Sequence, residues 1–183
     1  LTFLGQILIQ STLSGSLDDS HIINIAGRQR MLSQRLTKIA LLLNDPTISK
    51  KDKDIYSNIY PKSLKLWKES HFALKNNQLN IPKKYNVSNS KEIEILYNQV
   101  DPYFKNLYTL FEKAFLNKIS NDSKADILSN ERLYLELMER IVFAYDEEAT
   151  KRVETVKSFE LILLFLTIGT LLVEAFMIFS LLV

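Results

Sequence analysis

A long apolar run, LILLFLTIGTLLVEAFMIFSLLV, occupies residues Leu161 to Val183. As an α-helix its 23 residues would cross about 30 Å of hydrocarbon, because each residue adds about 1.5 Å. The helices that form the core of a soluble domain seldom run this long without a polar face. The run therefore predicts a membrane-spanning helix over 161–183.

The other end of the chain is also apolar. No charged residue precedes Asp18, and the run LTFLGQILIQSTLSG over 1–15 is too short to span a bilayer alone. We interpret it as the C-terminal part of a first transmembrane helix, with a cleaved signal segment as the alternative. Residues 16–160 are then expected to form a domain that is anchored in the lipid bilayer at both ends, which is the geometry of an extracytoplasmic sensor module.

Composition narrows the class of this middle domain. The net charge is only +2, which disfavours a general nucleic-acid binder with a basic surface, and no nucleic-acid partner is expected. The absence of cysteine excludes disulfides and thiolate metal sites. A hydrophobic content of 46% is ample for a packed core.

The middle domain has the pattern of helices. Its apolar residues recur at spacings of three and four, and no strand-like alternation occurs. Segments rich in Asn, Asp, Ser or Pro at 44–54, 76–90 and 117–123 separate four predicted helices, within which Pro61 and Pro102 should cause a kink or a short interruption. The predicted fold is all-α: an antiparallel, up-down four-helix bundle continuous with its flanking transmembrane helices and dimeric.

The segment INIAGRQRMLSQRLTKIALLL, Ile23 to Leu43, has three distinct helical faces. A nearly continuous apolar stripe is expected to face the bundle interior: Ile22, Ile25, Gln29, Leu32, Leu36, Ile39 and Leu43. A basic face is expected to lie in solvent: Arg28, Met31, Arg35 and Lys38. A mixed stripe lies between them: Ile23, Gly27, Arg30, Gln34, Thr37 and Leu41.

Arg30 on the mixed stripe is unusual, because neither solvation nor core packing accounts for an arginine one turn from Gly27. A glycine lets two helix backbones approach closely, so the stripe suits contact with a symmetry-related copy. Two Arg30 guanidinium groups about 5 Å apart would repel by roughly 3 kcal/mol at an effective dielectric near 20. An oxyanion between them would turn this repulsion into attraction. The simpler alternative is that Arg30 forms an ordinary surface or interhelical ion pair.

The same segment resembles the signature of the type IV pili methyl-accepting chemotaxis transducer N-terminal domain, the PilJ-type sensor module. It is also similar to the P-box of the NarX and NarQ nitrate/nitrite sensor kinases, in which an Asn, then Ala-Gly, then Arg-Met recur in this order. LWKESHFAL (Leu66 to Leu74), YDEEATKRVETVKSFELI and LLVEAFMIFSLLV resemble later parts of the family.

The resemblance implies a periplasmic helical bundle that dimerises and holds nitrate or nitrite at the dimer interface. It places the anion-contacting arginine on Arg30, the close-approach glycine on Gly27 and the asparagine on Asn24. The dimer-interface stripe would include Ile23 and Gln34. The kinase P-box has no Arg in the slots of Arg28 and Gln29, so the sequence is nearer the pili-type variant. The resemblance also implies that the domain lies in the periplasm and is anchored in a bacterial inner membrane.

Catalysis is not expected of this chain. It has no nucleophile–base pattern, phosphate-binding loop or zinc motif, and no cofactor is predicted. His21 and His71 lack ligands at a suitable spacing, and His71 is expected to be a packed or hydrogen-bonded bundle residue. Five aromatic residues are expected in the core: Trp67, Tyr103, Phe104, Tyr108 and Phe111. Asp101 and Glu112 are expected to be solvated charges.

The sequence leaves three functional classes open. The first is the oxyanion sensor, which would signal to cytoplasmic partners through an output domain such as a histidine kinase, a methyl-accepting transducer or a nucleotide cyclase. The second is a ligand-independent dimerisation or interaction module that senses a pilus subunit or envelope protein, with Arg30 only fixing the dimer. The third is a membrane-anchored structural protein.

Overall fold

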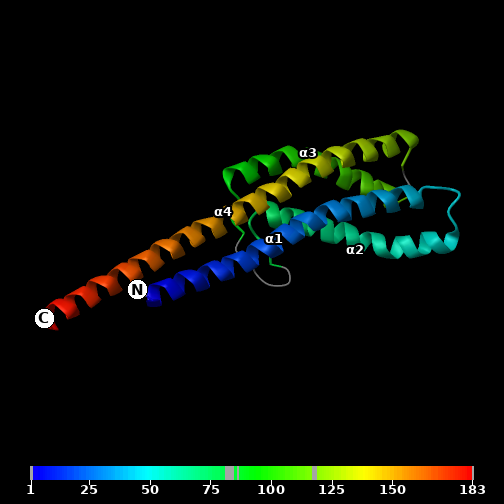
Figure 1. The fold of residues 1–183 in the computed structure, drawn as a ribbon. Coiled ribbons are helices and arrows are strands. Elements are labelled where there is room, and N and C mark those ends of the chain that lie inside the picture. The colour runs from blue at the N-terminus through cyan, green and yellow to red at the C-terminus, as the bar shows by residue number, and fades with distance from the viewer. Residues whose placement is uncertain (1, 81–84, 86, 117–118, 183) are drawn as a thin grey trace. The chain divides into compact units, whose positions relative to one another are not determined.

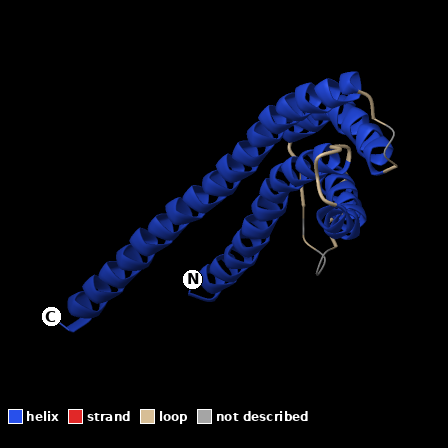
Figure 2. Cartoon of the chain, turned by 90° about the vertical axis from the view of Figure 1, so that its right-hand side faces the viewer, coloured by secondary structure: helices blue, strands red, loops and turns tan. Residues whose placement is uncertain are grey.

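A computed structural model describes the backbone of residues 2–80, 85, 87–116 and 119–182, and the side chains of 5, 10, 15, 17–80, 85, 87–116 and 119–180. Four helices follow one another along the chain (Figure 1): α1 Thr2–Leu43, α2 Lys50–Lys75, α3 Lys91–Phe115 and α4 Asn121–Leu182. Figure 2 shows no strand in the described ranges. The predicted all-α fold with four helices is confirmed.

Serine side chains fix where three of the helices begin. Ser49 accepts a hydrogen bond from the Asp52 amide at the start of α2, and Ser90 accepts one from the Ile93 amide at the start of α3. Ser120 accepts from the Ser123 amide at 3.2 Å, just before α4. Each cap satisfies an amide that has no partner within its own helix. These caps explain why α2 and α4 begin within the polar segments 44–54 and 117–123, and why α3 begins directly after 76–90.

The predicted interruptions at the two prolines do not occur. α2 continues through Pro61 and α3 continues through Pro102. A proline inside a helix costs about 3 kcal/mol, because it removes one hydrogen bond and crowds the preceding turn. Tyr60 and Phe104 lie close by on the same helices and are buried, so tertiary packing offsets this cost.

The helices divide between two compact units. One unit comprises residues 18–146, and the other comprises 1–17 together with 147–183. Both α1 and α4 contribute residues to each unit.

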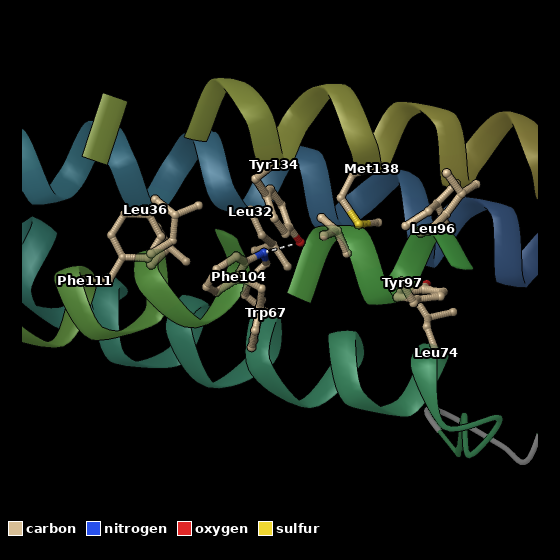
Figure 3. Packing of buried hydrophobic residues seen from close by; sticks show 14 of the residues in the cluster. Leu32, Leu36, Trp67, Leu74, Leu96, Tyr97, Phe104, Phe111, Tyr134 and Met138 are labelled. Atoms are coloured by element: carbon tan, nitrogen blue, oxygen red, sulfur yellow. Dashed lines mark hydrogen bonds between the residues drawn. The ribbon is translucent and has the colours of Figure 1, made fainter. Parts of the chain in front are cut away.

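The core of the 18–146 unit is built around Trp67 on α2 (Figure 3). The indole ring lies 4.4 Å from the ring of Phe104 on α3, measured between centroids, and its Nε1 donates to Tyr134 Oη on α4 at 3.0 Å. Leu32 of α1 is also fully buried in this cluster, as is Phe111 of α3. Trp67, Phe104 and Phe111 therefore lie in the core, as the sequence predicted, whereas Tyr103 and Tyr108 are only partly buried against it.

Within the other unit, α4 carries the helix that fits a bilayer. Among the described residues, only the helix over Asn121–Ser180 contains a window long and apolar enough to cross a membrane. The apolar side chains of that window, Phe165, Leu172 and Phe176 among them, are not buried in the structure. Most side chains of the predicted first span, 1–15, lie outside the described residues, although a Cβ at Gly5 would be 3.8 Å from Leu163 Cδ1.

Candidate functional site: the Arg30 face of the first helix

The three faces of the INIAGRQRMLSQRLTKIALLL segment are present on α1. Six residues of the predicted interior stripe are buried and Ile25 is partly buried. All four residues of the predicted solvent face, Arg28, Met31, Arg35 and Lys38, are exposed. Helical spacing predicts which of these side chains are buried and which are exposed, because α1 is one regular helix through this segment.

Arg30 has a partner within its own chain. Its Nη2 atom lies 3.1 Å from Glu139 Oε1 on α4, and the two side chains are 39% and 46% exposed. The ion pair ties α1 to α4, and it supplies the explanation for Arg30 that packing and solvation alone do not give. Glu139 was missed because no spacing rule connects it to a residue on a distant helix.

One donor of Arg30 is left over. The Nε atom is buried and has no hydrogen-bond acceptor among the described residues, although 39% of the side chain as a whole is exposed. A buried donor without a partner costs about 1–3 kcal/mol, so an additional acceptor near Arg30 would stabilise the structure. The guanidinium is therefore only partly satisfied by Glu139.

The neighbours of Arg30 form a shallow, open strip along α1. Gly27 is half-buried, and a Cβ there would meet no heavy atom within 4 Å, so no residue that the structure describes packs against this position. Asn24 and Gln34 are exposed, and Ile23 is partly buried against the core. Helical spacing thus brings the predicted ligand residues Asn24, Gly27 and Arg30 onto one accessible side of the unit.

A second polar cluster lies inside the bundle, away from that strip. His71 on α2 is fully buried and its Nε2 lies 3.3 Å from Asp101 Oδ1 on α3. Asp101 Oδ2 also binds Lys75 Nζ at 2.6 Å and Lys105 Nζ at 3.3 Å. The prediction of His71 as a hydrogen-bonded bundle residue is confirmed. The prediction of Asp101 as a solvated charge is wrong, because its carboxylate is the centre of this cluster.

The electrostatics of the cluster follow from burial and pairing. Burial lowers the pKa of His71, because the imidazolium would lose its water, although the hydrogen bond with Asp101 opposes that effect. The hydrogen bond with His71, followed by the contacts with Lys75 and Lys105, lowers the pKa of the Asp101 carboxyl. The stable form at neutral pH is thus a neutral histidine next to an ionised aspartate.

A short polar chain links this interior to the first helix. Tyr134 Oη, which accepts from Trp67, lies 3.5 Å from Gln29 Oε1 on α1. Gln29 Nε2 is buried and has no acceptor among the described residues. Gln29 directly precedes Arg30, so the exposed strip and the core share the same turn of α1.

Neither cluster is suited to a metal. Within the described part of the chain, no group of three or more His, Asp or Glu side chains could hold a metal ion. The ring of His21 lies 5.2 Å from the ring of Tyr85, measured between centroids.

A helical bundle joined to a helix that fits a bilayer has the architecture of a receptor's sensor module. A family model for the type IV pili methyl-accepting chemotaxis transducer N-terminal domain, PilJ, matches residues 11–129. This match covers more than half of the chain, and the chain belongs to that family. Neither the curated proteins nor the solved structures contain a match.

Membership of the family confirms the PilJ-type resemblance and gives the general function. The chain is a sensor module of a chemotaxis transducer, which is a signalling and not a catalytic role, and such domains lie in membrane-bound receptors. The relation to the NarX and NarQ kinases stays a prediction.

Proposed function

We propose that this module senses a small oxyanion, nitrate or nitrite, which two copies of the chain bind between their Arg30 side chains. In this proposal Gly27 provides the close approach of the two α1 helices, Asn24 lies one turn away as a further ligand, and Ile23 and Gln34 line the contact. The incomplete satisfaction of the Arg30 guanidinium carries the proposal. Within the described part of the chain its Nε has no acceptor, and Glu139, its charged partner there, is held in an exposed ion pair.

The Arg30–Glu139 pair does not prevent anion binding. Exposed ion pairs contribute about 0–1 kcal/mol, because water screens the charges and two long side chains lose freedom. An oxyanion that contacts two guanidinium groups offers each arginine a planar acceptor and more than one hydrogen bond. Replacing Glu139 by the anion as the partner of Arg30 therefore costs the protein little free energy.

Glu139 also changes the electrostatics of the dimer. With Glu139 bound to each Arg30, the two copies would meet as neutral pairs, and the roughly 3 kcal/mol repulsion between bare guanidinium groups would not build up. When Arg30 turns toward the anion, Glu139 is released. The ligand then compensates for both the lost ion pair and the two facing cations.

This exchange suggests how binding could produce a signal. Without ligand, Arg30 ties α1 to α4 of the same chain; with ligand, it would tie α1 to α1 of the partner. Such a change shifts α1 relative to α4 only if the ligand binds the two states with different affinity. Both helices also have residues in the unit that contains 147–183.

We assign 1–15 to the C-terminal part of a first transmembrane helix and 161–183 to a second transmembrane helix. Residues 16–160 are assigned to a periplasmic sensor domain.

Calorimetry on the full chain in lipid nanodiscs tests the anion assignment. Nitrate and nitrite, added as sodium salts, should bind. Sulfate and chloride, which differ from them in shape, serve as the competing anions. Arg30→Ala should weaken nitrate binding by tenfold or more, on the order of 1.4 kcal/mol. Arg35→Ala, which removes an exposed arginine from the solvent face of the same helix, should leave the affinity unchanged. Absence of binding, or equal weakening by both variants, would reject the oxyanion function.

The observed ion pair also favours a second candidate. Because Arg30 already has Glu139, the module could act without a ligand, as an interaction domain that recognises a pilus subunit or envelope protein. In that case Arg30→Ala should loosen the α1–α4 contact while no anion binds at any concentration. The same calorimetric experiment separates the two candidates.

A further inference from the structure

A groove of about 840 Å³ lies on the 18–146 unit between α2 and the C-terminal half of α3. It involves neither the Arg30 strip nor the buried His71 cluster. Its apolar lining includes Leu64 and Phe72 from α2 and Phe115 from α3. Phe72 and Phe115 are 36% and 39% exposed, so they offer apolar surface that the bundle itself does not use. Pockets for small ligands have volumes of about 300–1,000 Å³.

The polar groups of the groove carry opposite charges at two places. Lys68 from α2 reaches across to α3, where its Nζ lies 3.2 Å from Tyr108 Oη and 4.5 Å from the centre of the Tyr108 ring. This contact uses one of the three ammonium hydrogens, so two remain for an acceptor. Glu112 follows Tyr108 by one helical turn on the same lining and has no ion-pair partner among the described residues.

The other two charges of the lining neutralise each other. Lys65 Nζ lies 3.7 Å from Glu69 Oε1, one turn along α2. The groove therefore presents one uncompensated cation, Lys68, and one uncompensated anion, Glu112, with apolar surface around them. A ligand of a single charge would leave one of them unmatched. A ligand with both a carboxylate and an ammonium group would match both.

We propose that this groove binds a dipeptide with apolar side chains and free termini. The carboxylate of the peptide accepts from Lys68, and its ammonium group donates to Glu112. Lys68 is bound to Tyr108, and Glu112 lies one helical turn further along α3, so the two charges lie at neighbouring positions of the lining. The ends of an extended dipeptide are about 6–7 Å apart, so one dipeptide can reach both positions. The side chains of the peptide cover Leu64, Phe72 and Phe115. This second ligand site is independent of the proposed anion site on α1.

Titration of the full chain in nanodiscs with the dipeptide phenylalanyl-leucine tests the proposal. The free dipeptide should bind, and N-acetylation or C-amidation should each weaken binding by about fivefold, the factor that corresponds to roughly 1 kcal/mol for an exposed charge pair. Lys68→Met and Glu112→Gln should have the same effects as amidation and acetylation. Ala73→Trp, which fills the half-buried lining of the groove, should abolish binding.

Matched controls keep the test specific. Lys62→Met and Glu94→Gln remove exposed charges from α2 and α3 outside the groove and should leave the affinity unchanged. Thermal melts should show that each variant folds. The proposal is overturned if the free dipeptide gives no heat at millimolar concentration, or if the doubly blocked dipeptide binds equally well. It is also overturned if Arg30→Ala weakens peptide binding as much as Lys68→Met does, because the peptide would then occupy the α1 strip.

Discussion

Arg30 on α1 and Glu139 on α4 form an ion pair of 3.1 Å that crosses between two helices far apart in the sequence. The pair is nearly half exposed, so it holds α1 against α4 weakly, while the Nε of the same arginine remains without an acceptor. A weak tie next to an unsatisfied donor suits a residue that exchanges partners. The proposed sensing mechanism depends on this exchange.

Gly27 provides a test of the proposed dimer that needs no ligand. A Cβ at this position would meet nothing within its own chain, so Gly27→Ala should stabilise the isolated chain by about 0.5–1 kcal/mol through the lower backbone entropy of alanine. If two α1 helices approach at Gly27, the same methyl group should weaken self-association. Thermal melts and analytical ultracentrifugation in detergent measure the two effects. Gly15→Ala, at another open helical position, is the control for the stability effect.

The carboxylate of Asp101 should be important for the stability of the bundle. Asp101→Asn replaces a buried anion that holds His71 and Lys75, so we expect a loss of about 2–3 kcal/mol in the free energy of unfolding. Lys105→Met removes the most exposed partner of the same carboxylate and should cost less than about 1 kcal/mol. Urea unfolding followed by the fluorescence of Trp67, the single tryptophan, gives both values. Equal losses would contradict the central role of Asp101.

Buried His71 should make the stability of the bundle depend on pH. Burial holds its pKa below the ordinary value of 6.5, so the unfolded chain binds a proton more readily than the folded one. The stabilisation is complete above pH 6.5 and is lost progressively as the pH falls toward the lower folded pKa, by at most about 1.4 kcal/mol at a pH about one unit below 6.5. The pKa of Asp101 is lowered from its ordinary value of 3.8, so its contribution to the stability is present above pH 3.8 and is lost only in stronger acid.

The groups that surround His71 belong to α2, α3 and α4: Lys75, Tyr97, Asp101, Lys105 and Tyr134. Burial raises the pKa of Tyr97 and of Tyr134, and pairing lowers the pKa of Asp101, so the loss between about pH 7.5 and 5.5 should disappear in His71→Phe. Urea unfolding of the two proteins at both values measures this difference. An unchanged loss in the variant would assign the effect to other groups.

Local spacing made part of this structure predictable. The interior stripe of α1 could be predicted because side chains three and four residues apart share one face of a helix. The approximate ends of the helices could be predicted from the polar segments between them. The pairing of Arg30 with Glu139 and the burial of Asp101 could not be predicted. Both depend on which residues of different helices meet, and that is set by packing of the whole bundle. The peptide groove likewise exists only where α2 lies against α3.

The central claim is that Arg30 exchanges Glu139 for an oxyanion, and nitrate binding to Glu139→Gln tests it most directly. The glutamine keeps the size of the side chain but removes the competing charge, so nitrate should bind about fivefold more tightly than to the unaltered chain. Glu136→Gln, an exposed neighbour on α4, should change nothing. Tighter binding by Glu139→Gln alone is the predicted result; unchanged or weaker binding would contradict the exchange.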